Sequence, residues 1–262
     1  MNEKYRTKWT REETILAFDL YCKVPFSKIS KSNKDIIELA NLIGRTPSAV
    51  GLKMANLAHF DPEIRAKNLS GMANASKLDE EIFIEFANDW DGLSYQAQLI
   101  KASLYNKPIE DVIEKEIALE MEQIPPGKYR DTMMKTRVGQ YFFRTSVLSA
   151  YRNRCCVTGM LLPEILVASH IKPWKVSDEK TERTNPSNGL CFNSLHDKAF
   201  DKGLITIDLN YRIVLSKKLK ETSMDENTKN WLSLYEGKRI LLPDRFYPGK
   251  QFIEYHNDVI FK

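Results

Sequence analysis

The spacing of apolar residues changes along this chain, and that change constrains the fold more than any other feature. From Trp9 to about Phe60, apolar residues recur at intervals of three and four, the spacing of one buried face of an α-helix. Beyond residue 131 the pattern predicts a helix over Arg137–Tyr151 and then short runs rich in β-branched residues. We therefore predict the α+β class, with helices and strands in separate parts of the chain.

The charge of the chain is unevenly distributed. Lysine and arginine number 12, 4 and 23, and aspartate and glutamate 8, 12 and 15, in the successive segments 1–70, 71–127 and 128–262. With room for about two domains and a connector, we predict a helical domain over 1–75, an acidic helical connector over 76–130 and a mixed domain over 131–262. Two basic modules around an acidic connector favour binding to one polyanion, although solvated surface patches would give the same pattern.

Neither a membrane segment nor a structural metal is expected. Apolar runs such as 147–150 fall far short of the ~20 residues that span a bilayer, and residues 1–11 are too polar for a signal peptide. We expect a cytoplasmic protein that does not contact membranes. No two of the four cysteines have the C-x-x-C spacing of a zinc site, so structural zinc is not predicted, and free buried thiols are favoured over a disulfide.

The N-terminal part carries the signals of helices joined by a short turn. Thr10 and Glu13 form a capping box that begins the first helix, and Pro25 ends it. The second helix ends at Gly44, and Thr46-Pro47 begins a third. The sequence therefore predicts a helix-turn-helix-like domain.

In DNA-binding proteins of this type, the second helix of the motif enters the major groove. Four polar side chains fall at the start of the third helix or between its apolar positions: Arg45, Ser48, Lys53 and Asn56. They are candidates for DNA contact. A plain helical hairpin with a solvated polar face would show the same pattern.

Several short elements are predicted in the C-terminal part. Residues 165–171 have the composition of a strand, residues 193–200 of a short helix, and 204–207 with 211–215 of a hairpin. This order is the outline of a ββα unit.

The densest set of chemistry-bearing residues lies in the same region. In chain order it comprises Cys156–Gly159 (or Cys155, which has the C-x-x-T-G spacing), Ser169-His170-Ile171-Lys172-Pro173-Trp174, Asn188-Gly189-Leu190 and His196–Gly203. This series resembles the HNH (ββα-metal) endonuclease family, in particular a bacterial branch with the motifs C-x-x-T-G, A-H-I-x-P-W, N-G-L and H-D-x-A-F-D-x-G. The resemblance covers about residues 137–216. It implies that 131–262 is an HNH nuclease domain, which cleaves phosphodiester bonds with one divalent metal ion.

Two residues take catalytic roles under this resemblance. A neutral imidazole titrates near pH 6.5, so His170 could take a proton from the attacking water as a general base. Asn188 corresponds to the middle letter of the family name, and its amide is expected to tether the loop that orients this histidine.

The resemblance also implies a site for Mg²⁺ or Mn²⁺. His196 is the first candidate ligand and Asp201 the second. Asp197 lies four residues before Asp201 and shares its helix face, and hard Mg²⁺ prefers carboxylate oxygen; His196 and Asp197 are not ranked firmly. Many family members carry Asp or His before the base histidine, where this chain has Ser169, so Ser169 or a water takes that position, or both ligands come from the helix.

Basic residues near the motifs suit phosphate contacts that position a duplex, in particular Arg137, Arg144 and Lys172. Residues 9–50 also resemble a segment often found ahead of this HNH branch in restriction-type endonucleases, some of which depend on modified cytosine. We therefore hypothesise a Mg²⁺-dependent endonuclease of restriction or defence type that acts as a homodimer on double-stranded DNA, with cytosine methylation as a candidate requirement. The alternatives are a monomeric nicking or structure-selective nuclease and a catalytically inactive DNA-binding regulator.

Overall fold

The computed structural model describes residues 7–67 and 75–262 and divides into two compact units. The first comprises the described residues up to Ser146 together with Glu179–Asn185, and the second comprises Val147–Asp178 and Pro186–Lys262. This division differs from the predicted boundaries at 75 and 130. The reason is that helices of the expected acidic connector pack against the first N-terminal helix and so share its core.

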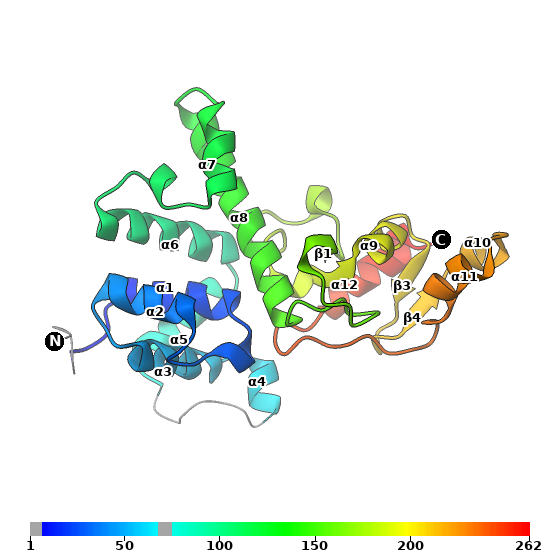
Figure 1. Cartoon of the computed structure of the whole chain (residues 1–262), viewed down its shortest axis with the longest axis horizontal. Helices are drawn as coiled ribbons and strands as arrows, with labels where there is room; N and C mark the ends of the chain where they lie inside the picture. Colours follow the sequence, from blue (N-terminus) through cyan, green and yellow to red (C-terminus); the bar gives the residue numbers. More distant parts are fainter. Residues whose placement is uncertain (1–6, 68–74) are drawn as a thin grey trace. The chain divides into compact units, whose positions relative to one another are not determined.

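The first unit is helical. Its elements are α1 (Arg11–Lys23), η1 (Phe26–Lys28), α2 (Lys34–Ile43), α3 (Pro47–Ala58), α4 (Pro62–Ala66), α5 (Lys77–Phe86), α6 (Trp90–Tyr105), η2 (Ile109–Asp111), α7 (Lys115–Glu122) and most of α8 (Lys128–Ala150). The helix α1 contacts α2, α3, α5 and α6 (Figure 1) and is buried along much of its length. The unit is therefore built around α1.

Local sequence signals set the ends of these helices, and the predicted caps are confirmed. The Thr10 hydroxyl accepts from the Glu13 backbone N–H at 3.2 Å while the Glu13 carboxylate accepts from the Thr10 N–H at 3.1 Å. Gly44 ends α2 in the left-handed conformation at φ 71°, which glycine adopts without steric cost. Thr46 caps α3, with Pro47 as its first residue.

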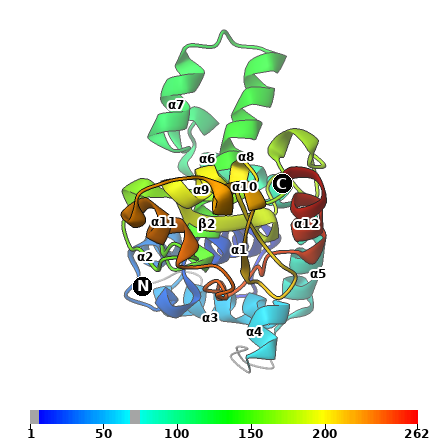
Figure 2. The same cartoon turned by 90° about the vertical axis from the view of Figure 1, so that its right-hand side faces the viewer.

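The helix α7 and the first half of α8 form an antiparallel pair, seen side by side in Figure 2. Their shared core contains Ile113, Ile117, Met121, Met134 and Val138. Burial of these side chains holds the pair together, because apolar surface removed from water stabilises by about 25 cal/mol per Å².

The second unit contains the predicted ββα outline. The strands β1 (Leu166–His170) and β2 (Gly189–Asn193) pair antiparallel, and α9 (Ser194–Asp201) follows β2 directly and packs on both strands. The strand β2 was not predicted. All five of its residues are buried, so it lacks the apolar and polar alternation that marks a half-exposed strand.

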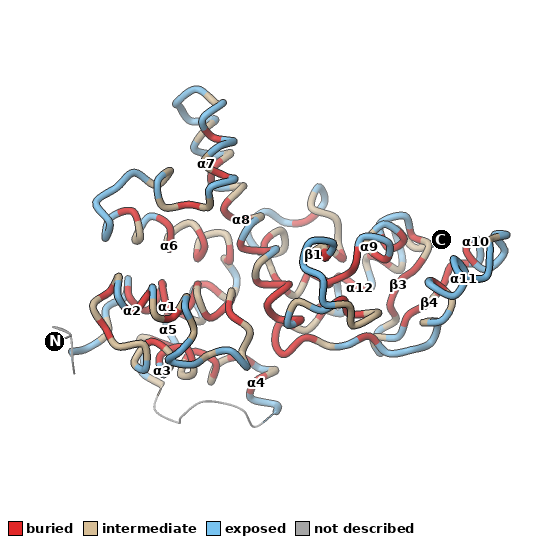
Figure 3. The backbone as a smooth tube through the Cα atoms, viewed as in Figure 1, coloured by how far each residue is buried: buried red, intermediate tan, exposed pale blue. Residues whose placement is uncertain are grey.

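Further elements surround this unit. They are η3 (Pro163–Ile165), η4 (Trp174–Val176), η5 (Pro186–Asn188), β3 (Ile205–Ile207), β4 (Ile213–Leu215), α10 (Lys217–Glu221), α11 (Glu226–Ser233), α12 (Lys250–Tyr255) and the π-helical turn η6 (His256–Ile260). The predicted hairpin is confirmed as β3 paired with β4. Figure 3 shows that α11 is exposed over most of its length.

The chain's last residues pack against the end of α9. Gly203 has φ 65°, and a Cβ there would lie 2.1 Å from the carbonyl oxygen of Ile260. The Lys262 backbone N–H donates to the Gly203 carbonyl at 3.2 Å. Gly203 thus lets the C-terminal turn approach α9. In the described part of the chain, no helix combines the length and apolarity needed to cross a membrane.

Candidate active site

His170 is the last residue of β1, where it pairs with Gly189 of β2. Its ring is half-buried and meets the Trp174 ring edge-on, with centroids 5.6 Å apart and planes at 89°. A strand end held by a partner strand and by an aromatic neighbour leaves the imidazole little freedom. The sequence therefore places this ring on a rigid element.

Asn188 ties the loop after His170 to the start of β2. Its fully buried side chain accepts from the Lys172 backbone N–H at 2.8 Å and donates to the Lys172 carbonyl at 3.1 Å. Its own carbonyl accepts from the Ile171 N–H at 2.9 Å, and its amide also lies 3.3 Å from the Ser177 hydroxyl. These bonds fix the two residues that follow His170.

A cavity of roughly 350 Å³ lies beside this histidine. Its polar lining comes from three segments, β1, α9 and the C-terminal turn: Ser169, His170, Asp197, Asp201 and His256. The structure therefore brings the predicted base together with three of the four predicted ligand residues.

The two carboxylates and Ser169 form an oxygen-rich set. Burial raises the pKa of Asp201, and the charge of Asp197 raises it further. The Ser169 hydroxyl is buried and makes no hydrogen bond within the described residues. A cation between these groups would relieve the repulsion and give that oxygen a partner, so the donors fit a hard divalent ion.

The cavity contains few side chains that bind metal ions strongly. Among residues 7–67 and 75–262, no group of three or more His, Cys, Asp or Glu side chains could hold a metal ion. Two carboxylates completed by a hydroxyl and water are nevertheless a common arrangement for Mg²⁺, which keeps several of its waters. The residues present therefore suit Mg²⁺ or Mn²⁺ better than zinc.

His196 does not line this cavity, although it was the first candidate for the metal. It is the third residue of α9, so its side chain projects about 100° around the helix from that of Asp197. Its ring is buried, and the Tyr235 ring meets it edge-on at 5.7 Å. Burial lowers the pKa of His196, partly opposed by the nearby Trp231 backbone.

The ring of His196 is nonetheless held in one tautomer. The Asn193 side-chain oxygen accepts from the His196 backbone N–H at 2.9 Å and lies 2.9 Å from Nδ1. Since that oxygen can only accept, Nδ1 carries the proton and the neutral ring presents a lone pair at Nε2. Within the described residues, Nε2 is buried without a hydrogen-bond partner, although the Trp231 backbone lies near enough to raise the pKa of the ring. Asn193, which sequence reasoning missed, therefore gives His196 the tautomer of a metal ligand.

His256 is a second residue that sequence reasoning missed. Its ring stacks on Phe200 at 3.6 Å, Nε2 donates to the Phe200 carbonyl at 3.1 Å, and Nδ1 lies 2.8 Å from the Thr206 hydroxyl. Burial lowers the pKa of His256 to about 4. A lone histidine 55 residues after Asp201 carries no local signal, because only the folded chain brings it to α9.

The structure revises the expected DNA-contacting role of Arg45 and Lys53. Arg45 is buried, with Nη2 2.6 Å from the Glu13 carboxylate and the guanidinium 4.3 Å from the centre of the Trp9 ring. Lys53 is buried in an ion pair with Asp79. Both charges are neutralised inside the helical unit, so neither can face a DNA groove.

The other two candidates on α3 differ from each other. Ser48 is exposed at the start of the helix. Asn56 is half-buried, and its side-chain oxygen is buried without a hydrogen-bond partner in the described residues. Only Ser48 presents its side chain freely to solvent.

The basic candidates on α8 and after β1 are more accessible. Arg144 is exposed. Arg137 is partly exposed and lies 2.7 Å from the Glu120 carboxylate. The Lys172 ammonium lies 5.5 Å from the centre of the Tyr255 ring.

Comparison with known families finds a match within the second unit. Residues 155–208 match the family model described as HNH endonuclease. The match begins at Cys155, whose sulfur accepts from the Asn193 backbone N–H at 3.3 Å, and it contains β1, β2, α9 and β3. No curated protein matches the chain.

Residues 155–208 of the second unit are therefore similar to the HNH endonuclease family, and this similarity supports nuclease activity on DNA. Nucleases of this family generally use a divalent metal. The matched segment includes His170, Asn188 and both cavity aspartates.

Proposed function

We propose that this protein is a divalent-metal-dependent endonuclease that hydrolyses phosphodiester bonds in double-stranded DNA. One observation carries the proposal: a single cavity is lined by His170 from the end of β1 and by Asp197 and Asp201 from α9. Hydrolysis of a phosphodiester needs a base beside an electrostatic stabiliser, and these residue types supply both.

His170 acts as the general base. Imidazole exchanges protons near neutral pH, so a ring nitrogen of His170 can take the proton of a water molecule as the water oxygen attacks phosphorus. The contacts of Asn188 with Lys172 fix the loop that follows, and so keep the ring directed into the cavity.

Asp197, Asp201 and the Ser169 hydroxyl hold Mg²⁺ or Mn²⁺ in this proposal. When bound, the ion neutralises charge on the scissile phosphate and on the departing oxygen. The ring of His196, with its lone pair at buried Nε2, would join this set only if its side chain turned toward the cavity.

Phosphate contacts come from the accessible basic side chains Arg144, Lys172 and Arg137, and Ser48 is the surface residue of α3 that we retain as a DNA contact. Such contacts position a duplex without reading its sequence. We further propose a role in restriction or defence, with action as a homodimer because cutting both strands requires two active sites.

The test is cleavage of a supercoiled plasmid with Mg²⁺ or Mn²⁺ by the wild-type protein and by His170→Ala. We expect the variant to lose cleavage by a factor of about 10² to 10⁴, the usual contribution of a general base, while its DNA binding in a gel-shift assay is retained. His59→Ala, which removes a histidine of the other unit, is the matched control and should cut normally.

Other results would point elsewhere. Nicked circles as the sole product would favour a nicking enzyme. A wild-type protein that binds DNA but cuts no form of it with either metal would indicate a regulator with an inactive nuclease fold.

We also propose that cytosine methylation is required for cutting. Parallel digestion of unmethylated and cytosine-methylated plasmid tests this requirement. Cutting of the methylated plasmid alone is the expected result, and equal cutting of both would remove the requirement and leave the nuclease proposal intact.

A further inference from the structure

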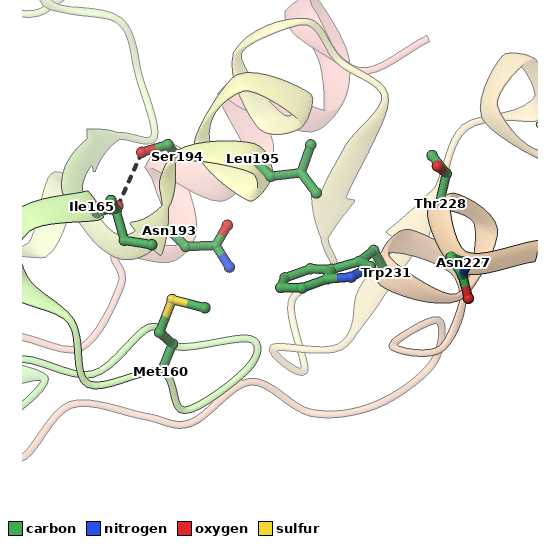
Figure 4. A pocket seen from close by; sticks show the side chains of 8 residues that line it. All are labelled: Met160, Ile165, Asn193, Ser194, Leu195, Asn227, Thr228 and Trp231. Carbon is green, nitrogen blue, oxygen red and sulfur yellow. Dashed lines mark hydrogen bonds between the residues drawn. The ribbon is translucent and has the colours of Figure 1, made fainter. Parts of the chain in front are cut away.

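A second hollow lies at the beginning of α9, formed entirely by the second unit. It has a volume of roughly 530 Å³, within the range of small-ligand sites. Its apolar lining comes from three segments of the chain (Figure 4): Met160, Ile165, Leu195 and Trp231. The other four lining residues are polar: Asn193, Ser194, Asn227 and Thr228. Trp231 is 46% exposed, an unusual position for a side chain with so much apolar surface.

Among these polar residues, Asn193 has a buried side-chain atom without a hydrogen-bond partner in the described residues. Asn193 is 2% exposed, and its side-chain oxygen is occupied by the backbone N–H and ring of His196. Its amide nitrogen is buried without a hydrogen-bond partner in the described residues. Figure 4 shows this nitrogen directed to the space between Met160 and the Trp231 ring.

A buried donor without a partner destabilises the structure, because it has lost its hydrogen bonds to water. Because the oxygen of the same amide is needed to cap α9, the group cannot turn round to offer an acceptor instead. The hollow therefore selects a ligand with an apolar, flat body and a hydrogen-bond acceptor on its edge.

We propose that this hollow binds a single nucleobase turned out of the DNA strand, an inference that rests on the proposed nuclease function. A nucleobase has two flat faces that stack on indole rings, and ring carbonyl and nitrogen atoms that accept from an amide. An aliphatic side chain from a protein partner would fill the walls but leave the Asn193 donor unpaired.

The position of the hollow suits a base close to the cut. The helix α9 has eight residues and therefore spans about 12 Å. The hollow lies at its first residues, and the carboxylates of the catalytic cavity lie on the same helix. Since a DNA strand advances about 3.4 Å per nucleotide, the bound base would lie within about four nucleotides of the hydrolysed phosphate.

The test measures DNA binding in the His170→Ala background, without divalent metal so that no strand is cut. The probes are fluorescein-labelled duplexes in which a single abasic site is moved along the sequence, and binding is followed by fluorescence anisotropy. Trp231→Ala should weaken binding of the intact duplex about tenfold, because stacking on an aromatic side chain contributes about 1–3 kcal/mol per base.

The abasic series identifies the base. At one position, removal of the base should itself weaken binding by the His170→Ala parent, and Trp231→Ala should then cause no additional loss. Asn193→Asp keeps an oxygen to cap α9 but replaces the donor by an acceptor, so it should weaken intact duplex and leave that abasic duplex unaffected. Leu209→Ala, which truncates an exposed apolar residue of the same unit, is the control and should bind normally.

The outcomes separate this inference from the nuclease proposal. If Trp231→Ala and Asn193→Asp bind every duplex as tightly as their parent while His170→Ala still abolishes cutting, the base site is refuted and the nuclease stands. Losses that are the same at every abasic position would also refute it, because they would show a contact other than a base. Quenching of Trp231 fluorescence by free nucleoside monophosphates, with no responsive position in DNA, would indicate a nucleotide site and overturn the DNA inference. If circular dichroism shows that Trp231→Ala does not fold, the result for Asn193→Asp tests the base site.

Discussion

Two buried cations of the helical unit and two buried polar groups beside the cavities of the second unit differ in whether they have partners. Arg45, in the turn before α3, and Lys53, on α3, are each paired with a carboxylate inside the helical core. In the second unit, the Ser169 hydroxyl and the Asn193 amide nitrogen each border a cavity and are buried without partners in the described residues. Paired groups satisfy each other within the fold, whereas unpaired groups next to a cavity can be satisfied by a bound ligand.

The largest effect should come from removing the cavity carboxylates. Asp197→Asn combined with Asp201→Asn should lower the cleavage rate by about a thousandfold or more, since a catalytic metal ion contributes several kcal/mol of charge stabilisation. Mn²⁺ binding, measured by electron paramagnetic resonance, should weaken in parallel. Glu164→Gln, which changes an exposed carboxylate of the same unit, should leave both unchanged. Normal Mn²⁺ binding by the double variant would place the ion elsewhere.

The second-largest effect should come from breaking a buried ion pair of the helical unit. Lys53→Met leaves the Asp79 carboxylate buried without its cation, a change that typically costs 3–5 kcal/mol in the free energy of unfolding. Urea denaturation measures this loss.

The combined change Lys53→Met and Asp79→Leu removes both charges and should recover most of that stability. In a folded double variant, DNA binding should match the wild type, because Lys53 does not reach the surface. A large loss of DNA affinity would indicate that Lys53 contacts DNA.

Acid should destabilise the second unit through His256. Burial lowers its pKa to about 4, whereas an unfolded histidine titrates near 6.5. The unfolded state therefore binds more protons between these values, and stability should fall as the pH falls from about 6.5 to about 4, by about 3 kcal/mol for this ring. Thermal melts across this range should show a shallower decline for His256→Gln than for His59→Gln. Identical slopes would mean that the ring is not buried neutral.

The smallest effect is expected from removing the Ser169 hydroxyl. Ser169→Ala deletes a buried hydroxyl that has no partner in the described residues, so without metal the variant should be more stable by about 1 kcal/mol. It should also need more Mg²⁺ for half-maximal cleavage. Denaturation in the presence of a chelator measures the first effect. A destabilised variant would show that the hydroxyl already has a partner.

Local signals in the sequence predicted much of the fold. The capping box at Thr10, the left-handed Gly44 and the hairpin after α9 each depend on neighbouring residues, and each is present. The strand β2 was missed because burial on both faces removes the alternating pattern that identifies a strand.

Residue contacts across the chain could not be predicted in the same way. Arg45 just before α3 and Lys53 on α3 fall at polar positions of the pattern, and only the packing of α3 with α1 and α5 shows that they meet carboxylates. His256 reaches the cavity through a contact with Phe200 that spans 56 residues. The motifs did predict His170 and both aspartates of the cavity, because these residues lie within one short stretch of chain.

The most direct test of the nuclease assignment is chemical rescue at position 170. His170→Gly opens a space where the ring stood, and the initial rate of plasmid cleavage is measured with Mg²⁺ in the presence and absence of free imidazole. We expect cleavage to be lost in the variant and partly restored by imidazole, with no restoration when a chelator removes the metal. A variant that cleaves DNA at the wild-type rate without imidazole would contradict the assignment of His170 as the base.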